Sequence, residues 1–536
     1  MTRPDPIERR DCFSAVAVLL VAGLAVGAWA SVSQGQDASW DLRAYHWYAG
    51  WAFWNDRLLH DIAPAGMHTF FNPALDTINY ALLAASPRSG TAALGAWSGL
   101  GFFLAGLVGF MQCRSRGRGL GFSMAVGLAI VALAGTGALT FSLSGLTSNE
   151  AQLIPFVAAA FARVHFAAMA PDARRQAAWC VAGGFAAGAA TGLKLTQLSY
   201  AAGFGVTLLA LAGIERRQAL LLWGIAGVLA GFALAGGAWA WRLAEHFGNP
   251  VFPFFDEWFH SPHAKLYDPL FIPVSRQALL TAALAPFSWF GQLVVWEAPF
   301  RDARIPAGLV AAAFGVLVLC WRMVKGRAQS REDRALWLLC VFYVGSFAAW
   351  VIVLRVSARY LAALESLSAC LVIVMLIRAL IMSRSRAVTA GFAVICACLV
   401  LAGATRPPDW GRIPFGARAV SFEPPRIEPD SLVLLIDRPD NSNQLTHLIP
   451  SLEPTATYVQ PWGQLARPGD GTLVTARIGQ AVRQAPRIYA LYYADREAEF
   501  RAQVFDALAL RPGEPLQIFR SNLSGERIAI AEVSRR

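Results

Sequence analysis

The chain has 536 residues, of which 56% are hydrophobic and 15% are charged, and it carries a net charge of +11. So few charges and so many long apolar runs exclude an ordinary soluble protein and predict a polytopic membrane protein. The positive charge does not indicate a nucleic-acid-binding surface, because the Lys and Arg residues form short clusters between the apolar runs. That arrangement is typical of cytoplasmic loops.

About eleven apolar runs are predicted to cross the membrane. We expect the first of them to be retained as a signal anchor. If basic clusters mark the cytoplasmic side, every cluster falls on that side, with the N-terminus inside and the C-terminus outside. The run 70–85 then cannot be a full span and is predicted to be an interfacial or re-entrant helix. The predicted spans are 13–32, 91–112, 119–141, 151–169, 177–193, 198–214, 219–241, 306–323, 335–354, 361–381 and 388–404.

This topology divides the chain into three parts. Residues 1–405 are predicted to form the transmembrane domain, with the outer segments 33–90 and 242–305, and residues 406–430 form a Pro-rich linker. Residues 431–536 are predicted to form a small α/β domain outside the membrane, because strand-like and helix-like stretches alternate there. The strand-like stretches are 432–436, 488–493 and 516–519, and the helix-like stretches are 473–484 and 496–508.

The first outer segment holds the densest group of acids, histidines and aromatic residues. If residues 41–55 are helical, then Asp41, Tyr45 and Tyr48 lie on one face. A second face would carry a tryptophan stripe, which is typical of a helix in the headgroup layer. Two interpretations stay open: an interfacial anchor with incidental polar residues, or a catalytic face. The stripe consists of Trp47, Trp51 and Trp54.

Several motifs occur in order along the chain. An Asp-Leu-x-x-Tyr motif, residues 41–45, follows the first membrane helix, and Arg359-Tyr360 opens a late helix. The remaining motifs are HDIAPAG at 60–66, FFNP at 70–73, GLKLT at 192–196 and GNPVFPF at 248–254. In this order they resemble the GT-C glycosyltransferases, particularly the family 87 type that uses polyprenol-phosphate-mannose. The resemblance covers most of residues 1–405 and leaves the tail uncovered.

The resemblance implies an inverting hexosyltransferase of the bacterial inner membrane. It implies transfer from a polyprenyl-phosphate sugar donor to a glycan, glycolipid or protein acceptor on the periplasmic face, where the C-terminal domain would also lie. In the family, the aspartate that matches Asp41 is the general base that removes the proton of the attacking acceptor hydroxyl. Asp61 is the second candidate acid, although Pro64 and Gly66 also fit a turn that Asp61 merely caps.

A leaving polyprenyl phosphate needs fixed positive charge. Lys194 ends an apolar span, where its charge is costly unless it is paired or faces water. It either binds the donor phosphate or snorkels to the interface. Arg355 and Arg359 are four residues apart on one helix face, which suits a donor phosphate or lipid headgroups. Arg242 is a further candidate for the donor phosphate.

The predicted substrate-binding residues are Tyr45, His46, Tyr48, Asn249 and Asp256. The last two belong to a Pro- and Phe-rich run that either lines an acceptor or lipid groove or packs on the bundle. Glu150 is interpreted as an acid in the first turn of a helix that Ser148 or Asn149 caps. The eight cysteines show no paired spacing, and a donor with a single phosphate needs no bridging metal, so we expect neither metal nor cofactor.

Two other classes of function stay open. A transporter or lipid flippase would place its key polar residues at mid-membrane, on broken helices in repeated halves. In this sequence they gather in the outer segments, and no internal repeat is evident. A non-catalytic envelope assembly protein that binds partners through its C-terminal domain is the other alternative, and that domain has no Gly-rich phosphate loop.

Overall fold

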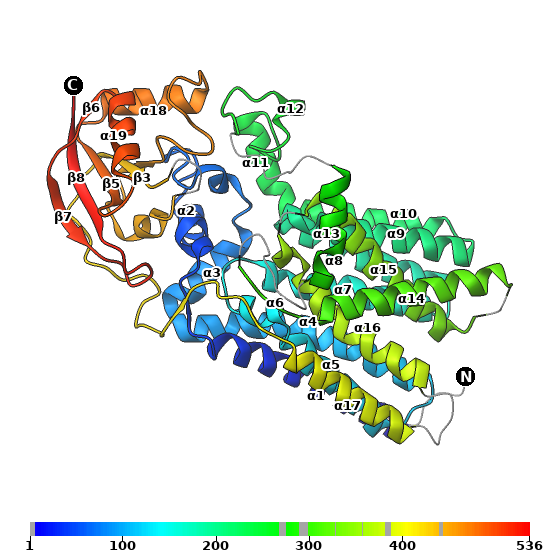
Figure 1. Ribbon diagram of the computed structural model, residues 1–536. Helices are drawn as coiled ribbons and strands as arrows, with labels where there is room; N and C mark the ends of the chain where they lie inside the picture. Colours follow the sequence, from blue (N-terminus) through cyan, green and yellow to red (C-terminus); the bar gives the residue numbers. More distant parts are fainter. Residues whose placement is uncertain are drawn as a thin grey trace. The chain divides into compact units, whose positions relative to one another are not determined.

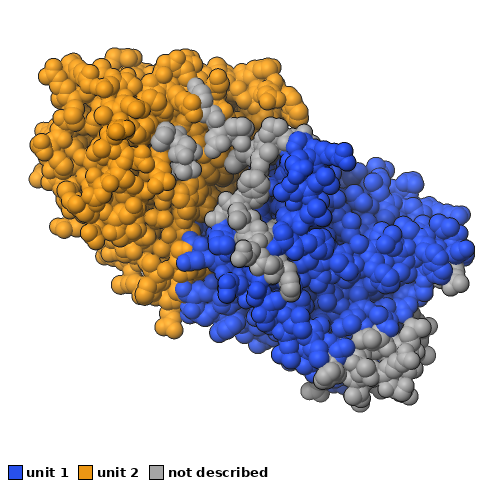
Figure 2. Space-filling view, viewed as in Figure 1, with its two compact units in different colours: residues 1–34, 91–236, 271–410 blue, residues 35–90, 237–270, 411–536 orange. Residues whose placement is uncertain are grey.

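The computed structural model describes residues 6–266, 275–288, 298–326, 329–355, 357–380, 387–438 and 443–536. The chain divides into two compact units, which Figure 2 colours separately. Unit 1 comprises residues 1–34, 91–236 and 271–410, and unit 2 comprises residues 35–90, 237–270 and 411–536. Unit 2 therefore gathers parts of both predicted outer segments together with the C-terminal part of the chain.

Unit 1 is built from α-helices (Figure 1), and every predicted span coincides with one of them. Among the described residues, eight helices are long and apolar enough to cross a membrane, by length and composition. The chain is therefore a mostly helical, multi-pass membrane protein, as predicted, while the count of eleven spans stays a prediction. The helices at the predicted spans are α1 (Pro6–Val32), α4 (Pro87–Ser115), α5 (Leu120–Gly135), α7 (Glu150–Met169), α8 (Ala173–Leu193), α9 (Leu198–Glu215), α10 (Ala219–Phe232), α14 (Arg304–Val324), α15 (Arg331–Val353), α16 (Ala362–Leu380) and α17 (Ala387–Gly403).

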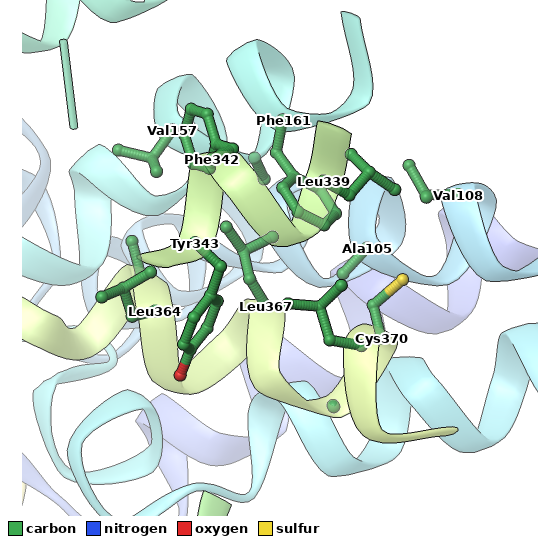
Figure 3. Packing of buried hydrophobic residues seen from close by; sticks show 14 of the residues in the cluster. Ala105, Val108, Val157, Phe161, Leu339, Phe342, Tyr343, Leu364, Leu367 and Cys370 are labelled. Atoms are coloured by element: carbon green, nitrogen blue, oxygen red, sulfur yellow. The ribbon is translucent and has the colours of Figure 1, made fainter. Parts of the chain in front are cut away.

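The core of unit 1 lies where α4, α7, α15 and α16 meet (Figure 3). Phe161 of α7 packs edge-on against Phe342 of α15, with ring centroids 5.7 Å apart.

Helix α8 packs differently, because its Gly184 and Gly188 let the backbone of α10 approach closely. A Cβ at either position would collide with that backbone. A helix rich in Gly and Ala has low hydropathy, so α8 is absent from the eight apolar helices although it is largely buried.

Two buried ionic groups hold helix ends in unit 1. At one, Arg304 pairs with Asp302 at 2.5 Å, and Glu365 accepts hydrogen bonds from the amides of Leu139 and Thr140 in the short helix α6 (Ala138–Leu143). At the other, Asp333 at the start of α15 accepts from three arginines, at 3.1–3.3 Å. Because these arginines come from three other parts of the chain, Asp333 ties several helix ends together. They are Arg116, Arg322 and Arg378.

Unit 2 contains a mixed sheet with the strand order β4-β3-β5-β8-β6, and β7 also pairs with β8. Strand β3 (Leu432–Ile436) runs parallel to β4 (Thr457–Val459) and β5 (Ile488–Tyr493), and β8 (Ile528–Arg535) runs antiparallel to β5. The predicted strands and helices of the tail are confirmed, whereas β4, β8 and β6 (Leu510–Arg511) were not predicted. The other confirmed elements are β7 (Pro515–Phe519), α18 (Leu473–Gln484) and α19 (Ala498–Ala507).

The outer segments in unit 2 pack on this sheet through two hydrophobic clusters. In one cluster, Ile62 lies beside Val459 of β4, and the Ile62 amide donates to the Tyr458 carbonyl at 2.9 Å. Helix α3 (Ala74–Ala85) has 12 residues, too few to cross a bilayer, which confirms that residues 70–85 do not form a full span, while their interfacial or re-entrant position stays a prediction. The remaining elements are β1 (Gln36–Asp37), β2 (Arg412–Ile413), α2 (Trp47–Trp54), α11 (Ala238–Phe247) and α12 (Asp256–Phe259).

The predicted outer segment 242–305 is not a simple loop, because it contains helices. Besides α11 and α12, it includes α13 (Arg276–Ser288), which belongs to unit 1 and was not predicted. Residues 267–274 and 289–297 of this segment lie outside the described residues.

Candidate active site

Asp41 lies at the start of a π-helical turn, Leu42–His46, which continues directly into α2. Its carboxylate is buried, and the Leu42 amide that follows it donates to the Ser39 hydroxyl at 3.3 Å. The expected single helix over 41–55 is therefore a π-turn followed by an α-helix, so one α-helical phase does not run through it. Such π-turns are frequent at functional sites, because they re-aim side chains within a helix.

The prediction that a tryptophan stripe faces the headgroup layer is wrong. Trp47 and Trp51 are buried, and Trp54 is 64% exposed. Trp47 packs on Tyr80 of α3, with ring centroids 4.6 Å apart, and the Arg57 guanidinium lies over the Trp51 ring. Helix α2 is covered because α3 and the 3-10 turn Thr446–Ser451 pack against it within unit 2.

His46 and Asp76 form a buried pair that sequence analysis did not anticipate. His46 Nδ1 lies 2.7 Å from Asp76 Oδ1, and both side chains are 2% exposed. Since a carboxylate accepts, Nδ1 carries the proton, and in the neutral ring Nε2 then presents a lone pair. Within the described part of the chain, Nε2 has no hydrogen-bond partner. The Tyr45 ring lies against His46, at 3.9 Å between centroids, and against His68, at 4.4 Å.

Asp61 is held by four hydrogen bonds. Its Oδ2 accepts from the Tyr48 hydroxyl at 2.8 Å and from Arg57 Nε at 3.1 Å. Its Oδ1 accepts from Arg57 Nη2 at 2.7 Å and from the Tyr458 amide at 3.0 Å. Burial and the neighbouring Asp61 charge raise the pKa of Tyr48 well above its usual range, so Tyr48 stays a proton donor to the carboxylate. With its acceptor positions filled, Asp61 is arranged to position Arg57 and Tyr48.

A second cluster lies in unit 1, around Glu150 at the start of α7. Lys194, at the end of α8, approaches Glu150 Oε1 to 2.5 Å and donates to the Ser148 carbonyl at 2.8 Å. Arg359, in the turn that opens α16, lies 3.5 Å from the same oxygen. Both cations also lie near the Tyr360 ring, at 5.9 and 5.7 Å from its centroid. Three distant parts of the sequence thus bring two cations to one carboxylate.

The local interpretation of Glu150 is correct in part. It lies in the first turn of α7, as predicted, where a carboxylate favours the helix dipole. The cap residue is Asn149, which adopts a left-handed conformation and makes no side-chain cap hydrogen bond. The pairing of Glu150 with Lys194 and Arg359 was not predicted, because nothing in the local sequence connects residues so far apart.

Of the remaining candidate residues, Arg242 lines a hollow together with Tyr48 and Asp56. Arg355 is buried and donates through Nη1 to the Ile352 carbonyl at 2.6 Å, while Arg242 pairs with the exposed Asp56. Asn249 bonds the backbone of its own loop, donating to the Phe254 carbonyl at 2.8 Å and accepting from the Val251 amide at 2.9 Å. Asp256 similarly accepts from the Ser261 amide at 2.7 Å. These bonds support the packing interpretation of the 249–256 run.

Phenylalanines of the same run pack within unit 2. The Phe252 ring stacks on Phe247 of α11 at 4.4 Å, and Phe70 packs edge-on against both. Among the described residues, no group of three or more His, Cys, Asp or Glu side chains is placed to hold a metal ion.

No protein-family model and no curated protein sequence matches the chain. Among solved structures, the chain is similar to ArnT from Cupriavidus metallidurans, in the apo state and bound to undecaprenyl phosphate. Each comparison gives 12% identity and a TM-score of 0.48, and covers 97% of this chain and 98% or 97% of the ArnT chain, respectively. It is also similar to the apo oligosaccharyltransferase of Archaeoglobus fulgidus, with 14% identity, a TM-score of 0.40, and coverage of 93% of this chain and 71% of that one.

The likeness to these structures is at 12–14% identity and with TM-scores below 0.5. It assigns no donor, acceptor or residue role to this chain.

Proposed function

We propose that this membrane protein is an inverting glycosyltransferase that moves a sugar from a polyprenyl-phosphate donor to an acceptor hydroxyl. One observation carries the proposal: Lys194 and Arg359 converge on the single carboxylate of Glu150, at 2.5 and 3.5 Å. Two cations and one carboxylate leave one net positive charge. That charge complements a polyprenyl-phosphate sugar, whose phosphodiester carries one negative charge.

In this proposal the cation cluster binds the donor phosphate and stabilises it as it leaves. The Lys194 and Arg359 side chains are 14% and 13% exposed, so a phosphate that reaches them is largely shielded from water. Charge-assisted hydrogen bonds are strong in such surroundings, and they strengthen further as charge develops on the leaving oxygen. Arg355 and Arg242 remain proposed secondary contacts to the phosphate or its lipid.

Asp41 is proposed as the general base. The acceptor oxygen attacks the anomeric carbon from the face opposite the phosphate, and its proton passes to the Asp41 carboxylate. The bond between the anomeric carbon and the phosphate oxygen breaks, and polyprenyl phosphate leaves with the electron pair. Asp41 is 4% exposed, so a hydroxyl that reaches its carboxylate is largely shielded from bulk water, which supports this role.

The other predicted acid receives a different role in the proposal. Four hydrogen bonds occupy Asp61, so we assign it as a positioning residue for Arg57 and Tyr48 rather than as a base. Tyr45 and His46 remain proposed substrate contacts, as do Tyr48, Asn249 and Asp256. The acceptor class, the periplasmic orientation and the domain division at residues 405 and 430 are likewise proposals that rest on the sequence.

The test compares Asp41→Asn with the wild type in membranes supplied with a panel of radiolabelled polyprenyl-phosphate sugars. The amide cannot accept the proton, so transfer from the accepted donor should fall by about 10²–10⁴-fold. Glu499→Gln is the matched control, because Glu499 is an exposed acid in the first turn of α19 in the same unit and should leave transfer unchanged. Full activity of Asp41→Asn on an accepted donor would overturn the assignment of the base.

A further inference from the structure

The carboxyl ends of the parallel strands in unit 2 form an edge that the proposed transfer chemistry does not use. Strands β3 and β5 are parallel neighbours, with Leu432 opposite Ile488 and Ile436 opposite Tyr492. They therefore end on the same side of the sheet, β3 at Asp437 and β5 at the run Tyr493 to Arg496. In sheets of this kind, ligands bind beyond the carboxyl ends of the parallel strands.

The antiparallel strands bring further side chains to this edge. Tyr493 lies opposite Ile528, the first residue of β8, so Glu526 and Arg527 just before β8 lie here. Phe519, the last residue of β7, pairs with the same Ile528, which brings Arg520 to the edge as well. Four strands thus direct charged side chains to one place.

A hollow of about 160 Å³ lies at this edge. Three arginines and two carboxylates line it, so its lining carries one net positive charge. Arg496 stacks on the Tyr493 ring at 3.7 Å and pairs with Glu526 at 2.9 Å. Arg527 pairs with Asp495 at 3.1 Å, whereas Arg520 makes no ion pair within the described residues. The lining therefore holds a cation, Arg520, that no described carboxylate neutralises.

Two buried polar atoms at the same edge have no hydrogen-bond partner among the described residues. Tyr493 is 2% exposed and lines the hollow, and its hydroxyl has no hydrogen-bond partner among the described residues. Asp437 is 4% exposed, and its Oδ1 likewise makes no hydrogen bond there, the nearest cation being Arg496 at 4.0 Å. Buried polar groups normally find partners, because leaving them unpaired costs free energy. A ligand or ordered water in the hollow would supply the missing partner of the Tyr493 hydroxyl.

We propose that this edge is a binding site for a small phosphate ester of a polyol, such as a phosphorylated sugar or glycerol unit. The arginines bind the phosphate, with Arg520 as its main contact, and the Tyr493 hydroxyl binds a hydroxyl group of the polyol. The size of the hollow fits a single headgroup or sugar unit rather than a long chain. The same chemistry occurs in a soluble phosphate ester and in a phospholipid headgroup.

The test measures binding to the full chain in detergent by isothermal titration calorimetry. The soluble probes are glycerol 3-phosphate and glucose 6-phosphate, with neutral glucose as the comparison, and phosphatidylglycerol dispersed in the same detergent tests the lipid source. Saturable binding of a phosphate-bearing probe, with none of glucose, is the expected result. Whichever phosphate-bearing arm binds identifies the source.

Three variants make the outcome decisive. Arg520→Ala changes an exposed side chain and should weaken binding by about tenfold or more. Tyr493→Phe keeps the ring under Arg496 and should weaken binding of the esters while leaving inorganic phosphate bound as before. Arg483→Ala, an exposed change at the end of α18, is the control and should bind like the wild type. Failure of every phosphate-bearing probe to bind, or equal binding by Arg520→Ala and Arg483→Ala, would overturn the proposal. Because no sugar transfer is measured, its failure is independent of the proposed transferase function.

Discussion

Removing Lys194 should both destabilise unit 1 and weaken donor-phosphate binding, and a second substitution should separate the two effects. Lys194→Met leaves the buried Glu150 carboxylate with Arg359 at 3.5 Å. At an effective dielectric constant of about 20, attraction across the 2.5 Å contact to Lys194 is about 6.6 kcal/mol, and across the 3.5 Å contact to Arg359 about 4.7 kcal/mol. Desolvation of the lysine offsets about half of the lost attraction, so the net cost is about 3 kcal/mol.

Glu150→Gln added to Lys194→Met removes the buried charge that the single variant leaves behind. The double variant should therefore melt between the wild type and Lys194→Met in detergent, as followed by tryptophan fluorescence. Its affinity for undecaprenyl phosphate should still be at least tenfold below that of the wild type, because the cation is absent. Arg174→Ala, an exposed change at the opposite end of α8, should alter neither property. A double variant that melts no higher than the single one, or that binds the lipid like the wild type, would refute this reasoning.

Three further predictions concern other buried groups. Asp76→Asn should lower kcat for transfer by about tenfold or more with little change in KM, because His46 Nδ1 loses its carboxylate acceptor; an unchanged kcat would argue against a role for this pair. Burial lowers the pKa of His447 to about 3 from 6.5, so the folded protein binds fewer protons than the unfolded chain between these values. Stability should fall with pH below about 6.5, and between pH 7.5 and 5 His447 should account for about 2 kcal/mol of the loss; equal slopes for wild type and His447→Asn in chemical denaturation would contradict this. Asp333→Asn leaves three arginines without their shared carboxylate and should cost about 3 kcal/mol, measured as a lower melting temperature that 1 M salt partly restores.

Periodicity and composition were sufficient to predict the helices at the apolar runs and part of the tail domain, whereas α6, α12 and α13 were not predicted. The run 432–436 was predicted as a strand because it is apolar throughout, and the reason is now visible: β3 is a central strand flanked by parallel neighbours and is buried along its whole length. Strand β8 was missed because its later residues, such as Glu532 and Ser534, lack that continuous apolar character. Its place in the sheet depends on pairing with β5, which local sequence does not encode.

The sequence was sufficient to predict which residues are candidates for the site. It was not sufficient to predict which of them contact one another. The spacing of Arg57 and Asp61 at i and i+4 was a local signal for an ion pair, and it was overlooked. The His46 and Asp76 pair joins residues 30 apart, and the Lys194 and Glu150 pair joins residues 44 apart. Such contacts arise from how helices pack, so a single sequence gives no sign of them.

The π-turn after Asp41 illustrates the same limit. A helical phase calculated from residues 41–55 assumes 3.6 residues per turn, and the π-turn at Leu42–His46 breaks that assumption. The orientation of the side chains on this segment therefore had to come from the structure. Their burial follows from α3 and the sheet domain, which cover α2 within unit 2.

Sugar transfer itself is tested most directly with a doubly labelled donor. A polyprenyl-phosphate sugar carrying ¹⁴C in the sugar and ³H in the lipid is supplied to the purified protein, reconstituted with membrane extract as the source of acceptor. The proposed function predicts that the labels separate, with ¹⁴C in the acceptor fraction and ³H remaining as free polyprenyl phosphate. Labels that stay together on one lipid, while that lipid changes sides of the membrane, would contradict transfer and identify a flippase.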